Sequence, residues 1–167
     1  MASFEFLALI LTGLGLTASI VYYANILRNA NKTQQMQLFM QFYSKLTDHN
    51  FHDEHTRIRN RTWNDLDDYV EKYGTGPNLL DVYLEGIGLL VKRKEIDIQF
   101  VDDLMSGIIL DYWGSHREII LAFRERIGQP QIGEWTEFLA GEIQRVAIKE
   151  HPELGKDAIP TYHKTNP

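Results

Sequence analysis

The chain has 167 residues, a length that favours one domain with an appendage. Its formal net charge of −6 argues against a nucleic-acid partner, because a general nucleic-acid binder needs a basic face for phosphate contacts. It has no cysteine, which excludes a disulfide framework, a thiolate zinc site and a cysteine nucleophile.

An uncharged, strongly apolar run extends from Phe6 to Leu27. As a helix it is roughly 33 Å long, enough to cross a bilayer core of about 30 Å. Its Leu, Ile, Phe and Val side chains favour insertion by about 3–7 kcal/mol before polar residues are counted. Thr and Ser hydroxyls can bond back to the helix backbone. The sequence therefore predicts a single transmembrane anchor over residues 1–28.

Three alternatives to a membrane span fit this run less well. A cleaved signal peptide has a basic start and a small-residue cleavage site, whereas Glu5 is acidic and no cleavage pattern follows. A buried core helix seldom has so long an uncharged run. An interfacial helix would have a strongly polar face, and this run has none.

Flanking charge predicts the orientation of the anchor. No Lys or Arg precedes the run, whereas Arg28 and Lys32 follow it. The positive-inside rule then places the N-terminus outside and the rest of the chain in the cytoplasm. We expect a single-pass protein of the cell membrane with a cytoplasmic C-terminal domain.

Two pairs of small residues lie four positions apart within the anchor, Gly13 with Thr17 and Gly15 with Ser19. Such pairs can let two membrane helices approach closely, which makes these four residues candidates for packing against a partner helix. The alternative is that small residues are simply common in membrane helices.

Helical spacing of apolar residues predicts an all-α domain over residues 29–149, a small bundle of about five helices. No breaker separates its first helix, residues 34–47, from the anchor. The expected later helices are residues 50–73, 78–93, 97–112, 115–127 and 132–148. Asn50 and Asp97 are expected N-caps, and Asn78 is expected to start its helix. A break or kink is expected at Gly114, a capping box that begins at Ser115 follows it, and Gly128 is a stop. Residues 150–167 are expected to form a flexible or extended tail.

The helix over residues 78–93 is apolar nearly all round, which is typical of a central helix. Gly86 and Gly88 cost helix propensity, so we expect a neighbouring helix to pack closely there. Glu85 is then a charge on a largely buried helix and needs a partner. We predict a structural ion pair with Arg117 or Arg124, although an acid–base role for such a carboxylate is the alternative.

A resemblance to a known family lies in two segments of the chain. They are residues 84–97 (LEGIGLLVKRKEID) and residues 111–113 (DYW), with Arg124 eleven positions after Trp113. They resemble the central signature of a domain-of-unknown-function family of short, often membrane-anchored, all-helical proteins. The resemblance covers roughly residues 34–144. It implies the helical fold and membrane attachment, and it transfers no catalytic residue.

His49, His52 and His55, interleaved with carboxylates, are weak candidates for a metal site. Histidines three positions apart drift around a helix, whereas ligands on one helix face are four apart, so a solvated helix start is the simpler interpretation. The chain has no phosphate-loop, dinucleotide-binding, metalloprotease or nucleophile-elbow motif, and we therefore expect no enzyme and no cofactor.

The leading hypothesis is a membrane-tethered helical interaction module that is an accessory or structural subunit of a larger membrane complex. Its expected partners are the lipid bilayer and other membrane protein subunits. The alternative is a membrane-attached sensor or signalling protein with a small-ligand pocket around Glu85. A third hypothesis is a metal-dependent enzyme that uses residues 49–55.

Overall fold

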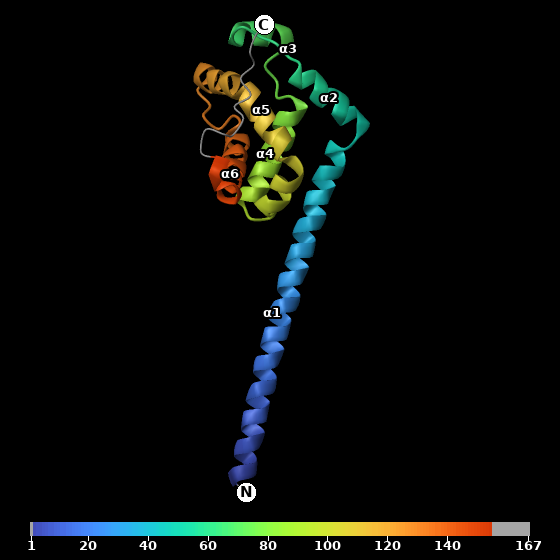
Figure 1. Cartoon of the computed structure of the whole chain (residues 1–167), viewed down its shortest axis with the longest axis vertical. Coiled ribbons are helices and arrows are strands. Elements are labelled where there is room, and N and C mark those ends of the chain that lie inside the picture. The colour runs from blue at the N-terminus through green and yellow to red at the C-terminus, as the bar shows by residue number, and fades with distance from the viewer. Residues whose placement is uncertain (1, 155–167) are drawn as a thin grey trace. The chain divides into compact units, whose positions relative to one another are not determined.

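The computed structural model describes residues 2–154, without the side chains of residues 2, 3, 46, 49, 50 and 154. The helices labelled in Figure 1 are α1 (Ala2–Leu46), α2 (His49–Arg59), α3 (Leu66–Tyr73), α4 (Leu79–Lys92), α5 (Ile98–Ile127) and α6 (Glu134–Glu150), followed by the 3-10 turn η1 (Pro152–Leu154). The prediction of an all-α chain, with a long apolar helix followed by five more, is confirmed. The chain divides into two compact units, residues 1–37 and residues 38–167.

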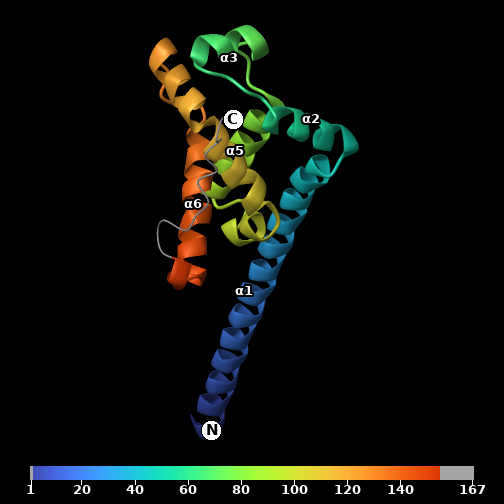
Figure 2. The ribbon, with the colours of Figure 1, turned by 45° about the horizontal axis from the view of Figure 1, so that its top comes forward.

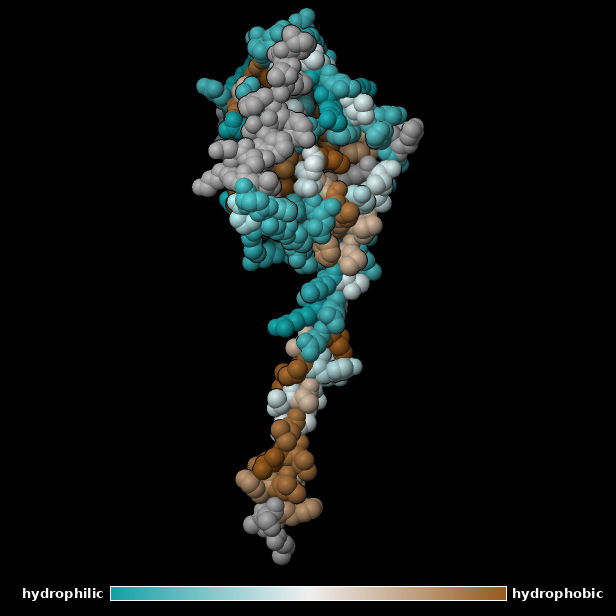
Figure 3. Space-filling model, in the orientation of Figure 1, coloured by the Kyte–Doolittle hydropathy of each residue, from teal (hydrophilic) through white to brown (hydrophobic). Residues whose placement is uncertain are grey.

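The first unit is the N-terminal part of α1, whose apolar side chains are exposed throughout (Figure 3). The hydroxyls of Thr12, Thr17 and Ser19 each donate to the carbonyl four residues earlier, at 2.8–2.9 Å, as predicted. Their polarity is thus satisfied within the helix. By length and composition this segment could serve as a single membrane span or as a signal sequence.

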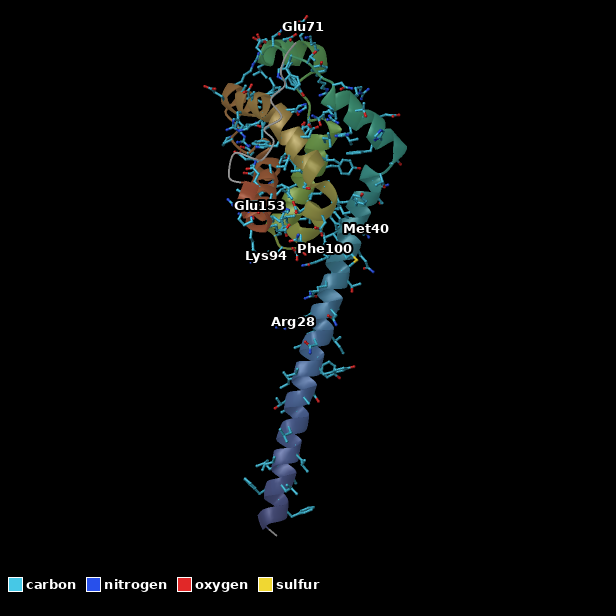
Figure 4. All side chains as sticks on the ribbon, viewed as in Figure 1. Arg28, Met40, Glu71, Lys94, Phe100 and Glu153 are labelled. Atoms are coloured by element: carbon cyan, nitrogen blue, oxygen red, sulfur yellow. The ribbon has the colours of Figure 1, made fainter. Side chains whose placement is uncertain are left out.

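In the second unit α6 packs against both α4 and α5. Figure 2 shows α6 alongside α5. The last turns of α1 join this core through Phe39, which is buried and stacks on Phe100 of α5 at 6.4 Å between ring centroids. Figure 4 labels Phe100 close to the C-terminal part of α1. The central side chains, all at most 1 % exposed, are Phe39, Ile58, Leu80, Leu84, Ile87, Ile96, Val101, Met105, Ile109, Leu139, Ala140 and Ile143.

Local capping signals fix several helix ends as the sequence predicts. Asn78 forms a capping box with Asp81 at the start of α4, and Asp97 accepts a hydrogen bond from the Gln99 amide at the start of α5. Gly128 ends α5 in the left-handed conformation, with φ of 65°. These ends are determined by residues within one turn of each boundary.

The single helix expected over residues 50–73 is in fact two helices, α2 and α3, with residues 60–65 between them. Asp65 starts α3 because its carboxylate accepts a hydrogen bond from the Asp68 amide at 2.9 Å. The Asp68 carboxylate in turn accepts from the Asn64 amide at 2.8 Å. This local cap competes successfully with continuation of the helix.

The break expected at Gly114 does not occur, because α5 runs continuously from Ile98 to Ile127. The Ser115 hydroxyl, predicted to cap a new helix, instead donates within the helix to the carbonyls of Asp111 (2.8 Å) and Tyr112 (3.1 Å). Tyr112 and Trp113 before the glycine and His116 after it are buried. Their tertiary packing outweighs the unfavourable helix propensity of one glycine, about 1 kcal/mol.

Close packing at the glycines of α4 is confirmed for Gly88. A Cβ atom added there would lie 2.3 Å from the backbone oxygen of Trp135, at the start of α6. At Gly86 the nearest atom would be the Phe42 ring, at an ordinary 3.5 Å. Only Gly88 is therefore required by the contact between α4 and α6.

Candidate functional site

Glu85 lies on α4 one turn before Gly88 and faces the first turn of α6. Its Oε1 atom accepts hydrogen bonds from the Thr136 amide at 2.7 Å and from the Thr136 hydroxyl at 2.8 Å. Gly133, the residue that precedes α6, offers no side-chain cap. Glu85 therefore caps α6 from another helix, where the helix dipole favours a carboxylate.

The partner of Glu85 differs from the predicted arginine. Arg124 binds Glu137 at 2.6 Å and donates to the Ile132 carbonyl at 2.6 Å, so it fastens α5 to the chain leading into α6. Arg117 is exposed on α5. Among the described residues neither arginine pairs with Glu85. The carboxylate is satisfied because backbone and hydroxyl donors at a helix start can replace a guanidinium.

We expect Glu85→Ala to lower the free energy of unfolding by about 1–3 kcal/mol, because it leaves the buried Thr136 amide without an acceptor. Glu85→Gln keeps an acceptor oxygen and removes only the charge, so its loss is expected to be smaller, about 0.3–1 kcal/mol. Urea unfolding followed by circular dichroism measures both. Equal losses in the two variants would contradict the capping role.

A second polar cluster joins the start of α4 to the middle of α5. The Tyr112 hydroxyl donates to Asp81 Oδ1 and accepts from Asn78 Nδ2 at 2.7 Å. Asn78 and Tyr112 are buried, and Asp81 is half-buried. Since each side chain finds its partners inside the cluster, the arrangement favours holding α4 against α5 over exchanging protons with a substrate.

Aromatic rings surround this cluster. The Tyr112 ring stacks on His116 at 4.4 Å, and His116 lies 5.0 Å from Trp63. Trp63 in turn contacts Tyr69 of α3 at 5.2 Å, edge to face. Tyr112 and Trp113 belong to the core, and this layer of rings ties α3 and the preceding loop to α5.

The environment of the cluster shifts two pKa values. Burial raises the pKa of Asp81, against hydrogen bonds from Tyr112 and Asn78 that lower it. Burial, with the neighbouring Asp81 carboxylate, raises the pKa of Tyr112 well above 10. The folded protein therefore holds the Tyr112 proton at a pH where the unfolded chain releases it.

This difference predicts an alkaline loss of stability. A phenol with a raised folded pKa contributes stability below pH 10, and that contribution falls as pH rises toward the folded pKa, by up to about 1.4 kcal/mol per pH unit. The stability advantage of the wild type over Tyr112→Phe should be constant from pH 7 to 9 and shrink above pH 10. Urea unfolding at each pH measures it, and a constant difference up to pH 11 would refute the assignment.

The histidines expected as weak metal candidates do not form a described site. His52 is exposed, His55 is half-buried with its ring stacked on Phe51, and the His49 side chain lies outside the described residues. Burial lowers the pKa of His55, and Asp111 opposes that shift. Among the described side chains no group of three or more His, Asp or Glu residues is placed to hold a metal ion.

An open groove, called here the basic groove, lies between α2 and α3. It has a volume of about 630 Å³ and is lined by Arg57, Asn60, Arg61, Lys72 and Tyr73. No motif in the sequence singles out these residues. Asp65, Asp67, Asp68 and Glu71 separate Arg61 from Lys72, so no local pattern marks the lining residues as one surface.

The four small residues of the predicted anchor lie on an exposed helix. A Cβ atom added at Gly13 or Gly15 would meet nothing within 4 Å, and Thr17 and Ser19 bond to the carbonyls of those two glycines. Their role in packing against a second membrane helix stays a prediction.

Comparisons with models of known protein families, with curated proteins and with solved structures give no match for the chain. The resemblance in residues 84–97 and 111–113 therefore stays a prediction. The structure does explain what these residues do here. Leu84, Ile87 and Val91 fill the core, Gly88 admits the backbone of α6, and Glu85 caps that helix.

Proposed function

We propose that the chain is a single-pass membrane protein whose helical domain serves as an interaction module, as an accessory or structural subunit of a larger membrane complex. The observation that carries this proposal is the exposed apolar segment of α1. Nothing within the described structure buries the side chains from Phe6 to Leu27, and a bilayer would cover them.

The domain itself supports an interaction role over a catalytic one. Its part-buried polar clusters, Glu85 with Thr136 and Asp81 with Tyr112, hold helices together. The alternative of a sensor with a ligand pocket at Glu85 has less support, because that carboxylate is engaged at the start of α6.

Mild extraction in a non-denaturing detergent, followed by native purification and mass spectrometry, tests the proposal. The expected result is reproducible recovery with the same membrane proteins at fixed stoichiometry. Recovery as a lone monomer would count against a subunit role. Extraction of the chain from membranes by alkaline carbonate would count against the anchor.

The lack of cysteine makes the orientation directly measurable. Glu5→Cys and Glu71→Cys place one thiol at exposed positions on either side of the proposed span; Figure 4 labels Glu71 on α3. With Arg28 and Lys32 on the cytoplasmic side, a membrane-impermeant maleimide added to intact cells should label position 5 and not position 71. The reverse pattern would overturn the orientation.

A further inference from the structure

The basic groove concentrates positive charge in a chain whose net charge is −6. Three of its five lining residues are cations, Arg57, Arg61 and Lys72, and none is acidic. Arg57 comes from α2, Arg61 from the loop after it and Lys72 from the last turn of α3. Three separate segments therefore each contribute one cation to the same groove.

Part of this surface is held in place by the residues beneath it. The Arg61 guanidinium donates to the Tyr69 hydroxyl at 3.0 Å and lies over the Tyr73 ring, 4.7 Å from its centroid. The Tyr73 hydroxyl is itself fixed by hydrogen bonds with the Thr62 amide (3.1 Å) and carbonyl (3.2 Å). A ligand would thus meet a guanidinium whose orientation is largely set before binding, which lowers the entropic cost of binding.

Carboxylates border the groove without lining it. Glu54 pairs with Arg57, whose side chain is 73 % exposed, and Asp68 pairs with Lys72, whose side chain is 43 % exposed. Exposed ion pairs of this kind contribute little to stability, because solvent screens them. A ligand with more than one negative charge can therefore displace Glu54 and Asp68 from these cations, because the ligand contacts several cations at once.

We propose that the basic groove binds a phosphate monoester, carried either by a small molecule or by a lipid headgroup. A monoester has about −1.5 to −2 charges and three acceptor oxygens, which match two guanidinium forks, an ammonium and the Asn60 amide. The groove is in the size range of small-molecule sites, so the organic part of the ligand also has room, beside Tyr73. This inference goes beyond the proposed function; its lipid form rests on the proposed membrane anchor, and its small-molecule form does not.

Calorimetric titration of the full chain in phosphatidylcholine nanodiscs with glycerol 3-phosphate, at constant ionic strength, tests the small-molecule form. We expect saturable binding of one ligand per chain. Arg57→Gln and Lys72→Gln should each weaken it about tenfold, the loss of one charge-assisted contact. Glu54→Gln should tighten it, because it removes the carboxylate that competes for Arg57.

Arg126→Gln and Arg145→Gln are the matched controls. Each removes one exposed arginine that pairs with a carboxylate outside the groove, and each should leave binding unchanged. Helical circular dichroism checks that every variant folds. Equal weakening in groove and control variants would overturn the proposal, because binding would then follow net charge alone.

Nanodiscs that contain phosphatidic acid test the lipid form. Broadening of the phosphatidic acid ³¹P signal by the wild type, lost in Arg57→Gln and Lys72→Gln, would assign the groove to a headgroup. The proposal is overturned if neither glycerol 3-phosphate nor phosphatidic acid binds in a way that depends on Arg57 and Lys72. Carbonate extraction does not involve Arg57 or Lys72, so failure of the groove and failure of the membrane anchor are distinguishable.

Discussion

We expect Gly88→Ala to lower the free energy of unfolding of the helical domain by about 3 kcal/mol or more. The added Cβ would lie 2.3 Å from the Trp135 oxygen, 2.7 Å from its carbonyl carbon and 2.9 Å from its Cβ. Because two of these atoms are backbone, no side-chain rotation relieves the contact, and α4 and α6 must move apart. Overpacking a dense core typically costs about 1–3 kcal/mol, and a backbone collision lies at the upper end.

Gly86→Ala is the matched control on the same helix. Its Cβ would meet only the edge of the Phe42 ring at 3.5 Å, an ordinary contact. Alanine also has the better helix propensity, by about 1 kcal/mol. Gly86→Ala should therefore leave the free energy of unfolding unchanged or raise it slightly. Urea unfolding followed by circular dichroism measures both Gly88→Ala and Gly86→Ala. Equal losses of stability in the two variants would contradict a backbone collision that is specific to Gly88.

Leu16→Arg is expected to release the chain from membranes. Leu16 lies near the centre of the uncharged run and is exposed on α1. The change loses a favourable leucine and adds an arginine near the helix centre, together about 3–4 kcal/mol. That penalty is comparable to the whole insertion free energy of about 3–7 kcal/mol expected from the apolar residues of the run.

Alkaline carbonate extraction of membranes measures this effect. The wild type should remain in the pellet, and a substantial fraction of Leu16→Arg should appear in the supernatant. Gln37→Arg adds the same charge at an exposed position outside the run, so it should behave as the wild type does. Release of all three proteins would contradict a membrane anchor at this segment.

The features that sequence reasoning predicted correctly depend on short-range chemistry. The helix starts at Asn78 and Asp97, the stop at Gly128 and the all-α class follow from residue types within one or two turns. The close approach at Gly88 was also predictable, because a glycine in the middle of an apolar helix costs stability unless packing compensates for it.

The errors arise where distant residues decide the outcome. The continuity of α5 through Gly114 depends on burial of the flanking aromatic residues, which outweighs a local break signal. The partner of Glu85 is 51 positions away, and Asp81 and Tyr112 are 31 positions apart. A sequence can reveal that a buried carboxylate needs donors, but only the packing of helices determines which donors reach it.

The separation between Glu85 and Thr136 also orders events during synthesis. The cap on α6 closes a loop of 51 positions, so it cannot form until the ribosome has released residue 136. At about 5–20 residues per second, translation reaches that residue roughly 2–9 s after it has passed Lys92, the last residue of α4. Throughout that interval the apolar face of α4 that receives α6 is uncovered, and exposed apolar surface of this kind makes a nascent chain prone to aggregation.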